Sequence, residues 1–253
     1  RGAWDARLEA LVVDSVMRGD ADESVRSRAS ALGWVETGAV TVVVGRAPGL
    51  HGDSAREEIV DEVRTAARHA GLTTLGAVQG DRLVIVTGGV SDPDKVGALL
   101  AGHFGPGPVV VGPAVTDLLQ AHVSAAEAVA GLRAAAGWPA GPALLTSDDL
   151  LAERSLDGDA LARRQLVTDV YEPLSAAQSG VLDTLTAFLD NGGSIEGTAR
   201  HLYVHPNTVR YRLKRVADVT GLSPTDARHA FTLRIALVLG RLQDRRAAPS
   251  DPL

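Results

Sequence analysis

The chain has 253 residues, contains no Cys and carries a formal net charge of −6. This length favours two domains over one, and the lack of Cys excludes disulfides and thiolate metal sites. No apolar run approaches the ~20 residues that span a bilayer and no signal-peptide pattern opens the chain, so we expect a soluble, cytoplasmic protein without a membrane partner. Because the chain begins with Arg1 and its single Met is Met17, we expect that an upstream segment is missing.

Helical spacing dominates the first part of the chain. Trp4, Leu8 and Leu11 recur at the intervals of one helix face, and a second short helix is expected up to Leu32. Residues 1–35 are therefore predicted to form a helical lead-in.

From about residue 36 the apolar pattern changes to that of strands. Val40–Val44 is a β-branched run typical of a strand buried on both faces. The pair Gly80-Asp81 is typical of a tight hairpin turn. The hairpin strands are expected at Thr73–Gln79 and Arg82–Thr87, and further strands at Val109–Val111 and Ala143–Leu145.

Helix signals separate these strands. Ser54 with Glu57, and Ser124 with Glu127, have the spacing of capping boxes and predict two helix starts. Pro93 is suited to the first turn of another helix. The resulting order is βαββαβ followed by a further helix and strand, which predicts an α+β fold of ferredoxin-like or palm-like type, with helices on one face of an antiparallel sheet.

The next segment is expected to connect two domains. Residues 148–173 are predicted to be linker helices, broken at Asp157-Gly158 and ended at a domain boundary by Pro173. An all-α domain is expected over residues 174–246, and residues 247–253 are expected to be a frayed tail.

The final domain has the pattern of a helix-turn-helix. A helix from Val181 should stop at Asn191-Gly192-Gly193, and Ser194 can cap the short helix that follows. Only Tyr203, Val204 and His205 then precede Pro206, which is suited to open a longer helix. This arrangement offers the second helix to a DNA major groove.

The helix from Pro206 separates apolar from polar side chains. Val209, Leu213 and Val216 fall on one side. Residues 174–246 hold ten Arg or Lys against six Asp or Glu, a local excess of positive charge that suits phosphate contacts. Arg212 lies nearer the core edge and is interpreted as structural or phosphate-directed. The residues predicted to contact double-stranded DNA are Asn207, Thr208, Arg210, Tyr211, Lys214 and Arg215.

The same residues carry a family resemblance. The string from His205 through Asn207, Thr208, Arg210 and Tyr211 to Leu213 resembles the C-terminal domain of PucR/CdaR-type bacterial transcription factors, the purine catabolism regulator family. Pro206 departs from the basic residue expected at its position. The resemblance implies a Fis-like helix-turn-helix that regulates transcription, preceded by a degenerate GGDEF-like domain, here residues 36–147. It also implies a sensory region upstream.

A nucleotidyl cyclase or a nucleotide-binding module is the main alternative. Cyclase chemistry needs two metal ions held by carboxylates on the first strand and in the hairpin turn. The strand Val40–Gly45 carries no acid, and the turn offers Asp81 alone. We therefore predict no catalytic residue, no cofactor and no metal site, and a middle domain that senses, dimerises or transmits.

An interaction module is the third possibility. Phe231, Ile235, Val238 and Leu242 repeat at near-heptad spacing in the last helix. Since helix-turn-helix proteins commonly bind two half-sites as dimers, we predict a homodimer, with a small-molecule effector acting through the upstream region.

Overall fold

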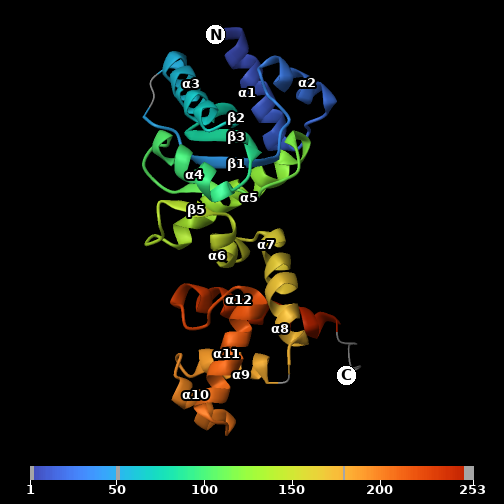
Figure 1. Ribbon diagram of the computed structural model, residues 1–253, viewed down its shortest axis with the longest axis vertical. Coiled ribbons are helices and arrows are strands. Elements are labelled where there is room, and N and C mark those ends of the chain that lie inside the picture. Colours follow the sequence, from blue (N-terminus) through green and yellow to red (C-terminus); the bar gives the residue numbers. More distant parts are fainter. Residues whose placement is uncertain (1–2, 50–51, 179, 248–253) are drawn as a thin grey trace. The chain divides into compact units, whose positions relative to one another are not determined.

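Figure 1 shows the computed structural model of the chain, which describes residues 3–49, 52–178 and 180–247. The chain folds into two compact units, and the boundary between them lies between Glu153 and Arg154. The first unit contains the β-sheet, and the helices after Arg154 form the second. No helix in the described part of the chain combines the length and apolar character needed to cross a membrane.

The sheet has five strands in the order β2-β3-β1-β4-β5. Neighbouring strands are antiparallel except β4 and β5, which are parallel. The predicted βαββαβ order with an added helix and strand is confirmed, as is the α+β class, and Gly80 makes the hairpin turn with a φ of 64°. The strands are β1 (Ala39–Arg46), β2 (Thr73–Gln79), β3 (Arg82–Val90), β4 (Val109–Val111) and β5 (Leu144–Thr146).

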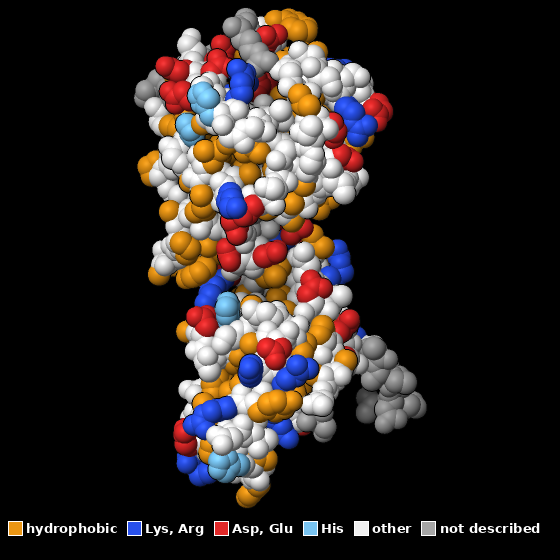
Figure 2. Space-filling view, viewed as in Figure 1, with side chains coloured by type: hydrophobic (Ala, Val, Ile, Leu, Met, Phe, Trp, Pro, Cys, Tyr) orange, Lys and Arg blue, Asp and Glu red, His pale blue; other side chains and the backbone are white. Residues whose placement is uncertain are grey.

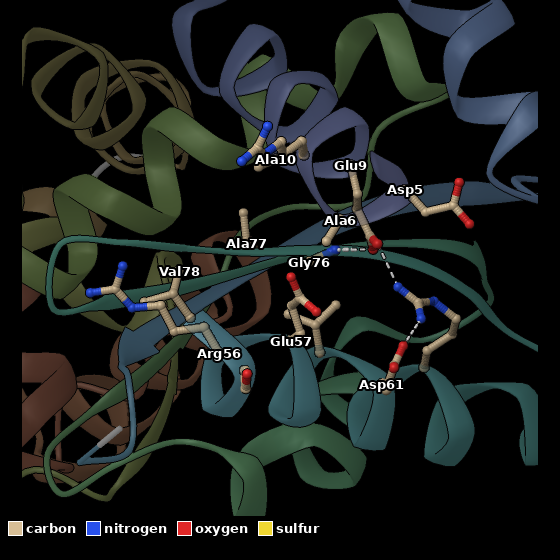
Figure 3. A pocket seen from close by; sticks show the side chains of 14 residues that line it. Asp5, Ala6, Glu9, Ala10, Arg56, Glu57, Asp61, Gly76, Ala77 and Val78 are labelled. Atoms are coloured by element: carbon tan, nitrogen blue, oxygen red, sulfur yellow. Dashed lines mark hydrogen bonds and ion pairs between the residues drawn. The ribbon is translucent and has the colours of Figure 1, made fainter. Parts of the chain in front are cut away.

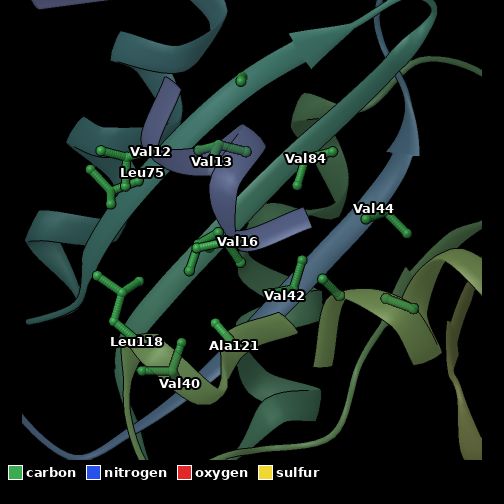
Figure 4. Close-up of a cluster of buried hydrophobic side chains, with 14 of the residues drawn as sticks. Val12, Val13, Val16, Val40, Val42, Val44, Leu75, Val84, Leu118 and Ala121 are labelled. Atoms are coloured by element: carbon green, nitrogen blue, oxygen red, sulfur yellow. The ribbon is translucent and has the colours of Figure 1, made fainter. Parts of the chain in front are cut away.

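Helices cover both faces of this sheet, so the expectation of helices on one face was wrong. The helices that precede residue 135 are α1 (Ala3–Arg18), α2 (Glu23–Ala31), α3 (Asp53–His69), α4 (Pro93–Leu100) and α5 (Ala121–Ala134). Val42 and Val44 of β1 pack in a core with α1 and α5, part of which is drawn in Figure 4. Val43 packs with α3 and α4 in a second core on the opposite face. The physical reason lies in β1 itself, because an apolar run without alternation can be buried only between two layers.

The two predicted capping boxes are also wrong. Helix α3 is capped by Gly52, so Ser54 lies inside the helix. Helix α5 begins at Ala121, and Ser124 is buried within it, where its Oγ accepts a 2.9 Å hydrogen bond from the Val42 backbone N–H. This interior Ser joins the helix to the central strand. Pro93, by contrast, opens α4 after an Asp92 cap, as predicted.

The second unit begins with several short helical segments. These are the end of α6 (Leu151–Leu156), then α7 (Ala160–Gln165), a π-helical turn (Leu166–Tyr171) and α8 (Glu172–Ala176). The helical structure is interrupted at Asp157-Gly158, as expected. Pro173 lies in the first turn of α8 and does not end the helical segment. Because Pro cannot donate the usual backbone hydrogen bond and its ring crowds the preceding turn, a widened π turn before it accommodates the ring.

Four helices complete this unit: α9 (Val181–Asp190), α10 (Ile195–Leu202), α11 (Pro206–Thr220) and α12 (Ala227–Ala247). Helix α12 packs on the π-helical turn. A β-carbon on Gly240 would lie only 2.0 Å from Cγ of Tyr171, so the aromatic ring rests directly on the glycine. The Tyr171 hydroxyl donates to Asp244, and this hydrogen bond raises the pKa of Tyr171. Of the predicted tail, residues 248–253 lie outside the described residues.

Candidate nucleic-acid interface

The turn between α9 and α10 positions the first helix of the motif. Asn191 caps α9, and Gly192 and Gly193 follow with φ values of 63° and 79°, in the left-handed region that favours glycine. Ser194 then caps α10 by accepting a 3.0 Å hydrogen bond from the Gly197 N–H. The predicted stop and start are confirmed.

A three-residue turn connects α10 to α11, as predicted. Tyr203 adopts a left-handed conformation with φ of 56° and ψ of 41°. His205 caps α11, since its Nδ1 accepts a 3.1 Å hydrogen bond from the Asn207 N–H. Pro206 occupies the first turn, where a missing N–H costs little. The cap and the turn together fix the direction in which α11 leaves the turn.

One side of α11 is anchored in the domain core. Val209, Leu213 and Val216 are buried, as predicted, and the helix packs against α9 and α10. The Arg212 guanidinium donates a 3.2 Å hydrogen bond to Oγ1 of Thr184 and lies against Gly180. Arg212 therefore has a structural role, which is one of the two roles expected for it.

The six predicted contact residues lie on the opposite side and at its edges. Asn207, Arg210, Tyr211 and Lys214 are exposed, whereas Thr208 and Arg215 are half-buried. Figure 2 shows Lys and Arg side chains mixed with acidic and His side chains over α10 and α11. Because the opposite side is held in the core, this face has a defined orientation.

The basic side chains of this face differ in their hydrogen-bond and ion-pair partners. Arg210 donates a 2.9 Å hydrogen bond to Oδ1 of Asn207 and lies 3.7 Å from a carboxylate oxygen of Glu196. Arg215 forms an ion pair of 3.5 Å with Asp218. Among the described residues, the Lys214 side chain has no hydrogen-bond or ion-pair partner. Lys214 is thus the basic group of this face that can meet a phosphate without giving up an internal contact.

Sequence reasoning missed one exposed aromatic residue. The Tyr203 side chain is 96% exposed at the tip of the turn. It lines a shallow hollow together with Glu196, Arg200, Val204 and Pro206. The available signal was an aromatic residue inside a three-residue turn that precedes the candidate recognition helix. Its hydroxyl and ring extend the candidate interface from α11 onto the turn.

The first unit contains a charged cleft of about 530 Å³ between α1, α3 and the edge strand β2, drawn in Figure 3. Its deepest charge is the buried carboxylate of Glu9, which accepts a 2.9 Å hydrogen bond from the Gly76 N–H and pairs with Arg64. Arg64 also pairs with Asp61. The bond from Gly76 satisfies one backbone N–H at the edge of β2 and joins α1 to the sheet, and the pair with Arg64 joins α1 to α3. Glu9 and Arg64 therefore have a structural role.

The position where a cyclase would hold metal ions lacks the required acids. Strand β1 carries no acidic residue, and Asp81 is an exposed turn residue. Within the described residues, no cluster of three or more His, Asp or Glu side chains could hold a metal ion.

Two family models match the chain in the order of its units. The GGDEF-like domain matches residues 18–134, and the PucR C-terminal helix-turn-helix domain matches residues 181–239. Fold and matches together define a two-part protein in which a GGDEF-like domain precedes a helix-turn-helix.

Comparison with individual proteins identifies the family within this class. The regulator of polyketide synthase expression from Bifidobacterium adolescentis has a crystal structure that is similar with a TM-score of 0.77 and 31% identity, over 94% of each chain. An uncharacterized protein of Mycobacterium tuberculosis (strain H37Rv) is 49% identical over 96% of this chain and 60% of its own length. The purine catabolism regulatory protein of Bacillus subtilis is 42% identical over 24% of this chain and 12% of its own length. This chain belongs to the PucR-type family of transcription regulators, and it spans about 60% of the length of the mycobacterial relatives it matches.

Proposed function

We propose that the chain binds double-stranded DNA sequence-specifically through α11 and thereby regulates transcription. The observation that carries this proposal is the exposed polar face of α11, oriented by buried Val209, Leu213 and Val216 on its other side. A helix held in this way after a short helix and a tight turn can enter a major groove. Because its target would be the bacterial chromosome, we also propose a cytoplasmic location.

The residues of this face suit different parts of DNA. Lys214 and Arg215 can meet phosphates, while Thr208 and Tyr211 carry hydroxyls that can donate to phosphate oxygens. Asn207 and Arg210 lie in the N-terminal part of α11. Base edges are usually read from this part of a recognition helix, and the two side chains suit adenine and guanine respectively. We therefore assign Asn207 and Arg210 to base recognition and the others to positioning.

The test begins with selection of bound duplexes from a random library by the whole chain. Binding of the recovered duplex is then followed by fluorescence anisotropy over a range of salt concentrations. Lys214→Ala is expected to weaken binding to all duplexes and to lower the salt slope by about one. Asn207→Ala is expected to change the preferred base at one position.

Lys95 supplies a matched control for the loss of one lysine. It lies on α4 in the first unit, where its side chain is 83% exposed. Lys95→Ala should leave the affinity and the salt slope unchanged. Unchanged binding in the double variant Arg210→Ala and Lys214→Ala would overturn the proposed interface.

We further propose that the chain forms a homodimer through an apolar line on α12, called here the α12 stripe: Phe231, Ile235, Val238 and Leu242. Phe231, Val238 and Leu242 are 37%, 48% and 47% exposed, although the opposite side of α12 is buried in its own unit. The alternating spacing of four and three residues is that of a coiled-coil seam, which a second copy of the same helix can match.

Sedimentation equilibrium tests this proposal. Val238→Glu should convert a dimer into a monomer, since it places a charge in the centre of the stripe. Gln243→Glu, an equally charged change at an exposed position outside the stripe, should remain dimeric. A wild-type chain that stays monomeric at high concentration would contradict the proposal.

For the GGDEF-like domain we propose a regulatory role without catalysis, since β1 carries no acid and the hairpin offers Asp81 alone. We also propose that an effector acts through a part of the protein outside this chain. Incubation with GTP and Mg²⁺ should yield no cyclic dinucleotide, and formation of one would overturn the regulatory assignment.

A further inference from the structure

A second cleft in the first unit has the features of a binding site. It encloses about 710 Å³ and lies beside the hairpin turn and the end of α5, and we call it the Arg46 cleft. Its charged lining consists of Arg46, Asp81 and Arg82, and its apolar lining includes Trp138 and Leu145. Neither the proposed DNA interface nor the α12 stripe uses these residues.

Strand pairing places two of these charges side by side. Arg46 on β1 is directly opposite Arg82 on β3 in the antiparallel register. Val44 and Val84, two residues away on the same strands, are opposite each other in the core that includes α5. Because side chains alternate along a strand, both Arg side chains belong to this same face of the sheet. Like charges directly opposite each other destabilise a sheet.

The structure does not neutralise this pair. Among the described residues, neither the Arg46 nor the Arg82 side chain has a hydrogen-bond or ion-pair partner. Asp81 is exposed in the turn and, within the same part of the chain, has no ion pair. Asp14 lies near this end of the sheet, where it accepts a 3.3 Å hydrogen bond from the Gln79 side-chain amide. Its carboxylate is paired with Arg18. Two guanidinium groups are therefore available to an anion.

Trp138 supplies a firm apolar wall to the same cleft. Its indole packs on the core that includes α5. Gly141 turns back over it, with its N–H donating a 2.9 Å hydrogen bond to the Trp138 carbonyl. A β-carbon at Gly141 would lie 3.0 Å from Cδ2 of the indole, so the turn lies in close contact with the ring. An indole held in this way can pack against a planar ring.

We propose that the Arg46 cleft binds a small anion that carries a planar ring. The carboxylate or phosphate group lies between Arg46 and Arg82, whose planar guanidinium groups suit either oxyanion. The ring packs on Trp138. Such a ligand removes the repulsion between the two Arg residues, so binding stabilises the GGDEF-like domain.

Calorimetric titration of the whole chain with four probes tests this proposal. Adenosine 5′-monophosphate offers a ring with a phosphate, and 2-naphthoate offers a ring with a carboxylate. Adenosine lacks the anion, and pyrophosphate lacks the ring. We expect one of the two ring-bearing anions to bind at one site per chain, at least about tenfold more tightly than adenosine or pyrophosphate.

Variants assign the binding to the cleft. The double variant Arg46→Gln and Arg82→Gln should lose about tenfold or more in affinity. Arg68→Gln, which removes an exposed charge from α3 on the other face of the sheet, should bind as the wild type does. Without ligand, Arg82→Gln should melt at the same or a higher temperature than the wild type, which separates lost binding from unfolding. Failure of both ring-bearing anions to bind at millimolar concentration, or unchanged affinity in the double variant, would overturn the proposal.

Discussion

The guanidinium of Arg210 donates a 2.9 Å hydrogen bond to Oδ1 of Asn207, one turn earlier on α11. The same guanidinium lies 3.7 Å from Glu196 on the preceding helix. The two residues suited to read bases are thus hydrogen-bonded to each other, and Arg210 also forms an ion pair with Glu196. In the proposed complex, DNA has to replace these internal contacts, which favours a sequence whose base edges can do so over one that offers phosphates alone.

Glu196→Gln is expected to strengthen binding to any DNA duplex. The change removes a negative charge 3.7 Å from Arg210, which belongs to the proposed DNA interface. Exposed ion pairs contribute up to about 1 kcal/mol, so affinity at low salt should rise about two- to fivefold. Anisotropy titrations at low and high salt measure the effect, which should shrink as salt increases.

Glu58→Gln provides the control, because Glu58 is an exposed acid on α3 in the other unit. It changes the net charge equally but should leave DNA binding unaltered. A gain of the same size in both variants would show that net charge is responsible and that the position of Glu196 is not.

Tyr203→Gly is expected to stabilise the helix-turn-helix. The left-handed conformation costs a residue with a β-carbon roughly 1 kcal/mol, and the side chain is 96% exposed, so little packing is lost. Urea unfolding should show a gain of up to about 1 kcal/mol. Tyr203→Ala keeps the β-carbon and should not show this gain. If the Gly variant is less stable than the Ala variant, the turn is not strained as described.

Gly240→Ala is expected to destabilise the second unit. The added carbon would lie 2.0 Å from Cγ of Tyr171, so either α12 or the π-helical turn must move. Overpacking of this kind costs about 1–3 kcal/mol, measurable in the urea transition. Gly102→Ala is the matched control, because nothing lies within 4 Å of its added carbon. Equal stability of both variants would contradict the close packing of Tyr171 on Gly240.

Asp159 should make the stability of the second unit depend on acid pH. Burial of this carboxyl acts to raise its pKa, but hydrogen bonds from the Ala162 N–H and from Arg154 outweigh burial, and the pKa of Asp159 is lowered. An acid with a lowered pKa stabilises the fold above its unfolded-state pKa of about 3.9, and this contribution is lost as pH falls through the lower folded value.

Asp159→Asn tests this dependence, since Asn can still cap α7 but carries no charge. Unfolding free energies measured from neutral pH down to strongly acidic pH should fall less steeply in the variant than in the wild type. At neutral pH the variant should be the less stable protein. Parallel pH profiles would show that the charge of Asp159 does not stabilise the unit.

The helix-turn-helix could be predicted closely because its signals are local. Ser194 caps the short helix, and Pro206 opens the longer one, as their positions indicated. Val209, Leu213 and Val216 are buried because helical periodicity places them on one side. Each of these features depends on residues within a few positions of each other.

Local patterns predicted the wrong structure where a side chain contacts a residue distant in the sequence. Ser124 and Glu127 have the spacing of a capping box, yet Ser124 lies inside α5 because its hydroxyl bonds to the Val42 N–H on the central strand. The exposed left-handed Tyr203 and the contact of Glu196 with Arg210 were likewise not foreseen, since both depend on how two helices meet.

The sequence by itself determined the order of the elements, the α+β class and the helix that carries the candidate interface, since periodicity and caps are short-range. Tertiary structure decided which charges meet. Strand register places Arg46 against Arg82 through the pairing of β1 with β3, two strands that are separated in sequence by α3 and β2. The Arg46 cleft and its proposed anion therefore follow only from the folded sheet.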